Sequence, residues 1–144
     1  MLGQASHRRE NYDRRRIHDN MNGIKVAPLG PDDVHVSIAS LDHRQLESGF
    51  FESILAKDEM ERANRFHFQK DRERFVAGRG LLRMILSPYV GVPPGEIIFT
   101  YGSRGKPALE RQEGRPSIEF NLAHSGGTAI YAITRDRPVG VDIE

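Results

Sequence analysis

The stretch IEFNLAHSGGTAIYAIT, residues 118–134, decides the fold. Residues 118–122 and 128–134 contain β-branched and aromatic side chains, and Gly126-Gly127 lies between these two runs. Such side chains favour strands, and a glycine pair between two apolar runs is typical of a tight hairpin. The stretch therefore predicts two antiparallel strands joined by a short turn.

Three more runs predict strands elsewhere in the chain. Ile97–Tyr101 and Val139–Ile143 are rich in β-branched or aromatic residues. Nearer the N-terminus, Val34, Val36 and Ile38 alternate with small or polar residues, which is the period of a strand with one buried face.

Helical patterns lie between the first strand and the hairpin. Apolar residues recur at helical spacing over residues 46–55. Asp58 and Glu61 have the spacing of a capping box, which predicts a short helix through residue 65. A longer helix is expected from Gln69 to Ser87, where the following proline ends or kinks it.

One side of the long helix is apolar. The residues expected on this core face are Phe68, Phe75, Leu82, Ile85, Leu86 and Tyr89. Arg79 projects to the same side, so it must snorkel, pair or meet an anion; a ligand contact and a structural role at the core edge are both open. Its neighbour Gly78 suggests close approach of another backbone or a ligand, because a mid-helix glycine costs roughly 1 kcal/mol against alanine.

These elements together predict an α+β fold, with a small, mostly antiparallel sheet packed by helices. The chain has 144 residues and 38% hydrophobic residues, enough for one modest core. It has no cysteine, which excludes a disulfide framework, and no apolar run of membrane-spanning length. Without a secretory signal pattern at the start, the cytoplasm is the expected location.

Basic residues are concentrated at the N-terminus. Residues 1–27 carry six Lys or Arg against three acids, and the remainder carries fifteen against seventeen. This segment has little apolar periodicity, so we expect a disordered extension over 1–27 and an ordered unit over 28–144. A solvated arm is favoured over one that contacts nucleic acid or an acidic carrier protein.

The acidic pair Asp142 and Glu144 is the strongest chemical signal. In an extended strand, alternate side chains point to the same face, so the two carboxylates would converge. Carboxylates that converge repel unless a cation relieves them, and Mg²⁺ is the expected occupant, with Mn²⁺ also open. For an isolated pair of this kind, a solvent-facing strand is the more common explanation.

Four motifs in register resemble the 4′-phosphopantetheinyl transferases of the Sfp type. They are Arg62-Ala63-Asn64-Arg65-Phe66 followed by Arg74 and Arg79-Gly80-Leu81-Leu82-Arg83; Gly105-Lys106-Pro107; Asn121-Leu122-Ala123-His124-Ser125-Gly126; and Gly140-Val141-Asp142-Ile143-Glu144. The resemblance covers roughly residues 30 to 144. It implies one half of a two-fold pseudosymmetric α+β fold, with coenzyme A bound between the halves.

The resemblance also implies a reaction. Members of the family move 4′-phosphopantetheine from coenzyme A to a serine of an acyl or peptidyl carrier protein with the help of Mg²⁺, and release adenosine 3′,5′-bisphosphate. Lys106 would contact a coenzyme A phosphate and His124 would donate to the 3′-phosphate. Further positive charge would come from the arginines Arg62, Arg65, Arg74 and Arg79. Asp142 and Glu144 would hold the metal.

Ordinary explanations exist for several of these residues. Lysines are common in surface turns, a histidine at a strand end is usually half-exposed, and the arginines also fit a solvated pair of helices. Ala123 departs from the serine common in the family, which removes one hydroxyl that would bond the cofactor phosphate.

The family's second half, with a third acid and a lysine on a helix, has no counterpart in these residues. No catalytic residue can therefore be named with certainty, and we expect the chain alone to be inactive. The alternative is a half-domain that binds coenzyme A or a carrier protein without catalysis, pairs with a second half-domain, or associates with itself to cover an apolar surface.

Overall fold

The structure, a computed structural model, describes residues 27–42 and 45–144. The basic extension expected over residues 1–27 lies outside this part of the chain, apart from its last residue. No helix among the described residues is both long enough and apolar enough to cross a membrane.

The described residues form five strands, three α-helices and one short 3₁₀-helix. In chain order they are β1 (His35–Ser40), α2 (Gln45–Ile54), α3 (Lys57–Ala63), α4 (Gln69–Val90), η1 (Pro94–Glu96), β2 (Phe99–Tyr101), β3 (Pro107–Leu109), β4 (Ile118–Ser125) and β5 (Thr128–Arg135). The α+β class expected from the sequence is confirmed.

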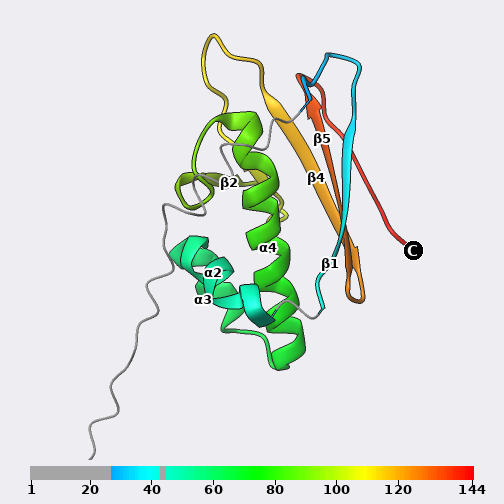
Figure 1. Cartoon of the computed structure of the whole chain (residues 1–144). Coiled ribbons are helices and arrows are strands. Elements are labelled where there is room, and N and C mark those ends of the chain that lie inside the picture. Colours follow the sequence, from blue (N-terminus) through cyan, green and yellow to red (C-terminus); the bar gives the residue numbers. More distant parts are fainter. Residues whose placement is uncertain (1–26, 43–44) are drawn as a thin grey trace, which may run out of the picture.

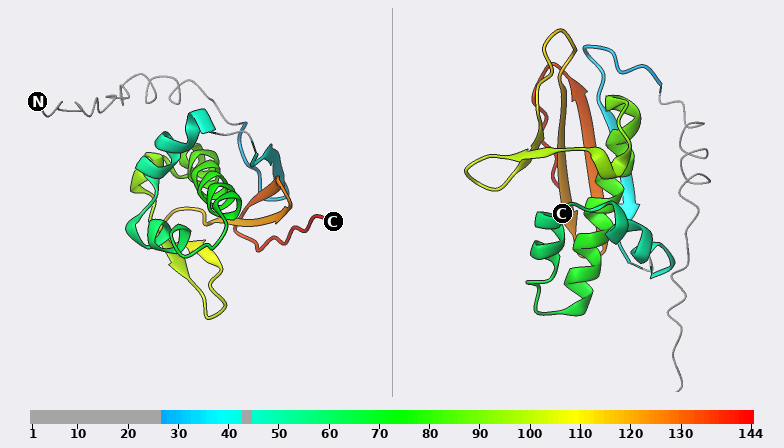
Figure 2. Two further views of the ribbon diagram at one scale, coloured as in Figure 1. Left: turned by 90° about the horizontal axis from the view of Figure 1, so that it is seen from below. Right: turned by 90° about the vertical axis from the view of Figure 1, so that its left-hand side faces the viewer.

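The elements are arranged in layers around α4. Strands β1, β5 and β4 form an antiparallel sheet in that order, and β2 pairs with β3 in a separate ribbon. Helix α4 lies along one face of the sheet, and α2 and α3 pack on the side of α4 away from it (Figure 1). Seen along α4, the β2–β3 ribbon projects from the side of this sandwich (Figure 2).

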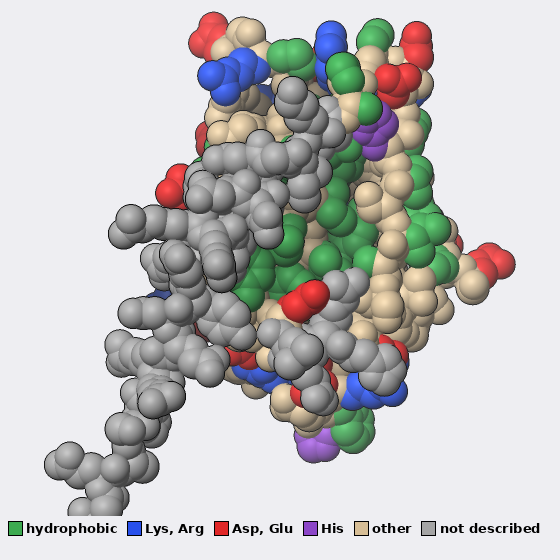
Figure 3. Space-filling view, in the orientation of Figure 1, with side chains coloured by type: hydrophobic (Ala, Val, Ile, Leu, Met, Phe, Trp, Pro, Cys, Tyr) green, Lys and Arg blue, Asp and Glu red, His purple; other side chains and the backbone are tan. Residues whose placement is uncertain are grey.

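The predicted hairpin is present. Strands β4 and β5 pair from Ile118↔Arg135 to Ser125↔Thr128, and Gly126 in the turn has φ of 54°, a conformation that glycine adopts without strain. The core faces of these strands bury Phe120, Tyr131 and Ile133 against α4. In the space-filling view, hydrophobic side chains follow the gap between the helices and β1 (Figure 3).

The predicted strand β1 is present, but its faces are the reverse of those expected. Val34, Val36 and Ile38 are 47%, 53% and 70% exposed. Register explains the reversal, because His35 is paired with Ile133, whose side chain is buried, and directly paired residues share a face. The imidazole Nδ1 of His35 lies 2.7 Å from the hydroxyl of Tyr89 on α4. The small and polar residues of β1 therefore face the helices.

Helix α4 begins where predicted and runs two residues past Pro88 to Val90, and its C-cap Gly91 has φ of 66°. Leu82 and Leu86 are buried as expected, whereas Phe68 precedes the helix and is 65% exposed. At Gly78 the nearest atoms are side-chain atoms 3.9 Å from the place of a Cβ, so the close backbone approach expected there is not found among the described residues, whereas a Cβ on Gly80 would overlap the Phe51 ring.

Helix α3 is shorter than predicted and is capped by different residues. Its N-cap is Ala56, whose backbone N–H donates to Glu59 Oε1 at 2.9 Å. The helix ends at Ala63 rather than at residue 65. The acid of the capping box is therefore Glu59, and the Asp58–Glu61 pairing was wrong.

Two short segments also differ from the expectation. Residues 107–109, for which no strand was predicted, form β3, and residues 97–98 precede β2 rather than belonging to it. Val139–Ile143 is not a strand in the described structure, although it runs as an extended trace (Figure 1). Its backbone forms a hydrogen bond with a side chain instead: Val141 N–H donates to Asn121 Oδ1 at 3.2 Å.

Candidate functional site

Two of the candidate arginines lie at the C-terminal end of α3. Arg62 is exposed, and its guanidinium carbon lies 5.3 Å from the centre of the Phe75 ring on α4. Arg65 lies in the turn that follows α3, where its Nε is 3.4 Å from the Glu61 carbonyl. Both can reach a ligand without breaking an ion pair that the structure shows.

Arg74 is held by a partner that the sequence analysis did not find. Its Nε and Nη2 donate to the two carboxylate oxygens of Asp42 at 2.8 Å and 3.0 Å. The hydrogen bond to Asp42 raises the pKa of Arg74 above its ordinary value. Asp42 itself lies against the hairpin, because a Cβ on Gly127 would lie 2.1 Å from its Oδ2.

Arg79 is inside the protein, with its side chain only 8% exposed. Its Nη1 lies 4.0 Å from Glu59 Oε2, and neither atom has a hydrogen-bond partner among the described residues. Its guanidinium also lies 5.6 to 6.0 Å from the centres of three rings, those of Phe75, Phe99 and Tyr101. Of the two roles left open for Arg79, this environment favours the structural one.

Glu59 and Arg83 form a buried ion pair beside Arg79. Both side chains are 1% exposed, and Arg83 Nε donates to Glu59 Oε1 at 2.8 Å. Arg83 Nη1 also donates to the carbonyls of Pro94 and Ile97, each at 2.9 Å. One guanidinium therefore joins α3, α4 and the connection that leads into β2. The sequence analysis did not predict this role of Arg83. The available signal was the four-residue spacing between Arg79 and Arg83, which places both side chains on one side of α4.

Lys106 is exposed in the turn between β2 and β3. Gly102 N–H donates to the Lys106 carbonyl at 3.2 Å, and Gly105 has φ of 72°. Pro107 then begins β3 opposite Tyr101. The turn is therefore closed by backbone hydrogen bonds, and the lysine side chain is presented to solvent from a fixed backbone.

His124 lies near the end of β4 and faces the helices. It is paired with Ala129, whose side chain is buried on the helix side of the sheet, and paired residues share a face. The imidazole is exposed because β4 is an edge strand. Two residues earlier on that face, Leu122 is paired with Tyr131, whose hydroxyl donates to the Gly78 carbonyl at 2.9 Å.

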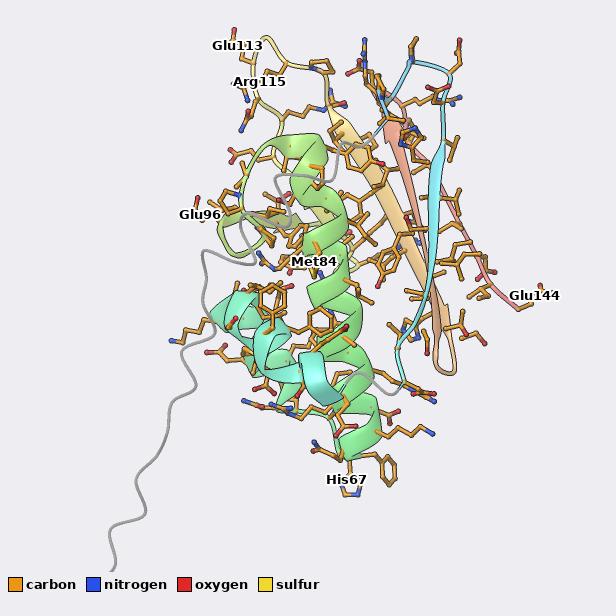
Figure 4. All side chains as sticks on the ribbon, viewed as in Figure 1. His67, Met84, Glu96, Glu113, Arg115 and Glu144 are labelled. Atoms are coloured by element: carbon orange, nitrogen blue, oxygen red, sulfur yellow. The ribbon has the colours of Figure 1, made fainter. Side chains whose placement is uncertain are left out.

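Asp142 and Glu144 lie on the exposed side of the C-terminal segment. Exposure alternates along residues 139–144, with Val139, Val141 and Ile143 half-buried and the residues between them exposed. The two exposed carboxylates therefore lie on one side of an extended segment that is not hydrogen-bonded as a strand, and their convergence on a metal ion stays a prediction. Glu144 points away from the helices (Figure 4).

This pair fits a divalent ion that also binds a ligand. Among the described residues, no group of three or more His, Cys, Asp or Glu side chains could enclose a metal. Mg²⁺ is commonly held by one or two carboxylates together with phosphate and water, so two carboxylates on one side suffice for that arrangement.

The sheet separates the two sets of candidates. His124 is on the helix face, whereas Asn121, which holds the C-terminal segment, is three residues away and faces the other side. A ligand that touches both sets must pass around the edge formed by β4. An extended molecule with phosphates at separated positions meets that requirement.

Two cavities lie beside α4. One, of about 450 Å³, is lined by Asp42 and Arg74 together with residues of α2. The other, of about 470 Å³, lies near the opposite end of α4 between Tyr89 and Arg115, and none of the candidate residues lines it. The candidate site is thus an open surface rather than the larger of these cavities.

Comparison with known proteins gives a consistent result. The family described as "4′-phosphopantetheinyl transferase, N-terminal" matches residues 44–135. The chain is 43% identical over 113 residues to the 4′-phosphopantetheinyl transferase HetI of Nostoc sp., which covers 78% of this chain and 48% of that protein. It is 31% identical over 88 residues to the human L-aminoadipate-semialdehyde dehydrogenase-phosphopantetheinyl transferase, covering 60% of this chain and 28% of that one.

The chain spans about half the length of HetI and less of the other curated relative named here. Among solved structures, the holo-(acyl-carrier-protein) synthase of Bacillus anthracis in complex with coenzyme A shares the fold with a TM-score of 0.56 at 23% identity, over 71% of this chain and 93% of that one. The coenzyme A complex of the Helicobacter pylori synthase gives a TM-score of 0.51 at 16% identity, over 72% and 99% of the two chains.

Proposed function

Because the chain belongs to the 4′-phosphopantetheinyl transferase superfamily, we propose that it binds coenzyme A as one half of a transfer site. At that site, 4′-phosphopantetheine would pass to a serine of an acyl or peptidyl carrier protein. The observation that carries the proposal is the exposure of Arg62, Lys106 and His124. They present three polar, phosphate-binding side chains to solvent from three different elements: α3, the β2–β3 turn and β4.

Each of the proposed contacts follows from charge and exposure. Lys106 and His124 would donate to phosphate oxygens, and Arg62 on α3 and Arg65 in the turn after it would add positive charge. Arg74 would reach a phosphate only by sharing its guanidinium with Asp42. Residues 28–144 would then be the half-domain that binds the nucleotide part of coenzyme A.

In the proposed transfer, the serine oxygen of the carrier protein bonds to the β-phosphorus of coenzyme A. The bond from that phosphorus to the bridging oxygen breaks, adenosine 3′,5′-bisphosphate leaves, and the serine proton passes to a base outside the residues assigned here. The chain's cations hold the leaving nucleotide, which lowers the cost of the charge that develops on it. Asp142 and Glu144 would hold Mg²⁺, which supplies charge neutralisation at the diphosphate.

Calorimetric titration of the purified chain with coenzyme A and with 3′-dephospho-coenzyme A, each in Mg²⁺, tests this proposal. Wild-type chain should bind coenzyme A more tightly, and Lys106→Ala and His124→Ala should each reduce the difference between the two ligands. Arg104→Ala is the matched control, because Arg104 is an exposed cation in the same turn without an assigned contact. Equal binding of both ligands by the wild type would refute the phosphate-reading role.

Binding without transfer is the second candidate function. It is favoured by the absence, among the described residues, of a third side chain able to complete a metal group with Asp142 and Glu144. Incubation with coenzyme A, Mg²⁺ and a carrier protein, followed by mass measurement of the carrier, separates the two functions. A carrier that gains the mass of phosphopantetheine identifies a transferase, and an unmodified carrier in the presence of bound coenzyme A identifies a binding half-domain.

A further inference from the structure

Arginines and aromatic rings alternate across the candidate site. The guanidinium of Arg62 lies over one side of the Phe75 ring, and Arg79 lies 5.6 Å from the centre of the same ring. Arg79 in turn lies 5.7 Å from the centre of the Tyr101 ring. We call the series Arg62, Phe75, Arg79 and Tyr101 the arginine–aromatic stack.

The stack connects two of the proposed ligand contacts. Its first member, Arg62, is itself one of them and lies on α3. Its last member, Tyr101, ends β2 opposite Pro107, the residue after Lys106. Between these exposed ends lies Arg79, which is buried and belongs to the central helix α4.

The contacts of Arg79 depend on its charge. Its nearest acidic neighbour is Glu59 Oε2 at 4.0 Å, and its Nη1 has no hydrogen-bond partner among the described residues. Besides the packing of its methylene groups, the charged end is attracted to the carboxylate and to the faces of the rings, and a neutral side chain of the same size would lose this attraction. Burial raises the pKa of the Tyr101 phenol and the charge of Arg79 acts in the opposite direction, which agrees with their closeness.

The ribbon that carries Lys106 is short, and its strand residues Phe99 and Leu109 pack against the core. Strands β2 and β3 have three residues each. On the inner side, Phe99 meets Arg83 at 5.0 Å and the Phe120 ring at 5.9 Å. At the outer end, next to Lys106, Tyr101 is 41% exposed, and the guanidinium of Arg79 on α4 lies against its ring.

We propose that Arg79 is a positioning residue, whose charge holds the β2–β3 turn at a fixed separation from the end of α3 so that Lys106 and Arg62 meet phosphates of one ligand. The proposal rests on the proposed coenzyme A site for the identity of that ligand. The fixed separation itself is a property of the chain without ligand and can be measured alone.

The chain has no cysteine, which allows two spin labels to be placed without background. Cysteines replacing Glu61 on α3 and Arg104 in the β2–β3 turn are both at exposed positions. Double electron–electron resonance should give one narrow distribution of the distance between the two labels in the parent chain. Arg79→Met, which keeps the length but removes the charge, should broaden or shift it, and Arg79→Lys should give a smaller change.

Tyr131→Phe is the control for a general loss of packing. It removes the hydroxyl that donates to Gly78 on another side of α4, and it should lower stability without changing the label distance. Tyr101→Leu removes the ring at the outer end of the stack at a position 41% exposed, so it keeps the proposal testable if Arg79→Met does not fold. It should broaden the distribution as Arg79→Met does.

The same variants are then titrated with coenzyme A and 3′-dephospho-coenzyme A. Arg79→Met should lose most of the preference for the 3′-phosphate, whereas Tyr131→Phe should keep it. An unchanged label distance in folded Arg79→Met, or in Tyr101→Leu if the former is unfolded, would overturn the positioning role. If the parent chain shows no preference between the ligands, the proposed function fails, and the label distances still decide the role of Arg79.

Discussion

Arg74 on α4 and Asp42 after β1 are joined by two parallel hydrogen bonds of 2.8 Å and 3.0 Å. This bidentate pair ties the first part of the long helix to the end of the sheet where the β4–β5 hairpin turns, since Leu41 N–H also donates to the Gly127 carbonyl. One of the cations expected to serve the ligand thus also anchors the fold.

The pair should behave as a unit in unfolding experiments. Asp42→Asn and Arg74→Gln should each lower the thermal midpoint by a few degrees, and the double variant should lose little more than either single one, because each change removes the same interaction. Thermal denaturation of the four proteins measures this coupling. Fully additive losses would show that the two side chains stabilise the chain independently.

Two nearby glycines of α4 should respond in opposite ways to alanine. Gly80→Ala should destabilise the chain by about 1–3 kcal/mol, because the new methyl group would overlap the Phe51 ring in a packed core. At Gly78 the nearest atoms lie 3.9 Å from the place that an alanine methyl group would take, so Gly78→Ala should be neutral or stabilising by up to about 1 kcal/mol. Urea denaturation measures both changes in the free energy of unfolding. Equal losses in the two variants would contradict the closer packing around Gly80.

Removal of the Glu59 carboxylate should be among the most damaging single changes. Glu59→Ala leaves Arg83 buried without its partner and takes the nearest negative charge from Arg79. Breaking a buried pair in this way typically costs about 3–5 kcal/mol. Glu61→Ala is the control, since the Lys57–Glu61 pair is exposed and should contribute nothing measurable. Equal midpoints of the two variants in urea would refute the structural role of the buried pair.

Asp136 should make stability depend on pH in acid. The backbone N–H of Ser117 donates to its carboxylate at 2.7 Å and lowers the pKa below its ordinary value of 3.8. A lowered pKa stabilises the folded state above the ordinary value, and that stabilisation is lost as the pH falls through the folded value. Asp136→Asn should therefore be less stable than wild type at neutral pH, with the difference vanishing in acid. Asparagine tolerates the φ of 56° found here, so the comparison isolates the charge.

Asp142 and Glu144 should matter for metal and not for folding. The double variant Asp142→Asn, Glu144→Gln should keep the thermal midpoint, because both side chains are exposed, and should lose any increase in coenzyme A affinity caused by Mg²⁺. Glu113→Gln, on an exposed loop away from the segment, is the control (Figure 4). An undiminished Mg²⁺ effect in the double variant would exclude these carboxylates as its source.

Local signals predicted most of the fold. The hairpin, the start of α4 and the α+β class follow from side-chain periodicity and glycine placement, which act over a few residues. The face of β1 could not be predicted in this way, because register with β5 and the contact of His35 with Tyr89 decide it, and both involve distant residues. The apolar character of Val36 and Ile38 pointed to the wrong side.

The sequence indicated which residues are candidates for the site, but it did not indicate which residues they contact. The projection of Arg79 toward the apolar side of its helix was predicted from the helical wheel, but its burial was not, and its neighbour Glu59 lies on another helix with no sequence signal that links the two. Asp42 was missed for the same reason. For Val139–Ile143, composition predicted a strand. In the structure, a backbone N–H of this segment donates to a side-chain oxygen on β4 rather than to the backbone of a neighbouring strand.

Strand β1 lies at the edge of the three-stranded sheet and turns Val36 and Ile38 outward. Within the described part of the chain, its second backbone edge pairs with no other strand, so an open edge and an apolar surface occur together. Such a combination is a template for strand addition between molecules. The purified chain should therefore associate more as its concentration rises. Ile38→Lys should raise the concentration at which association begins.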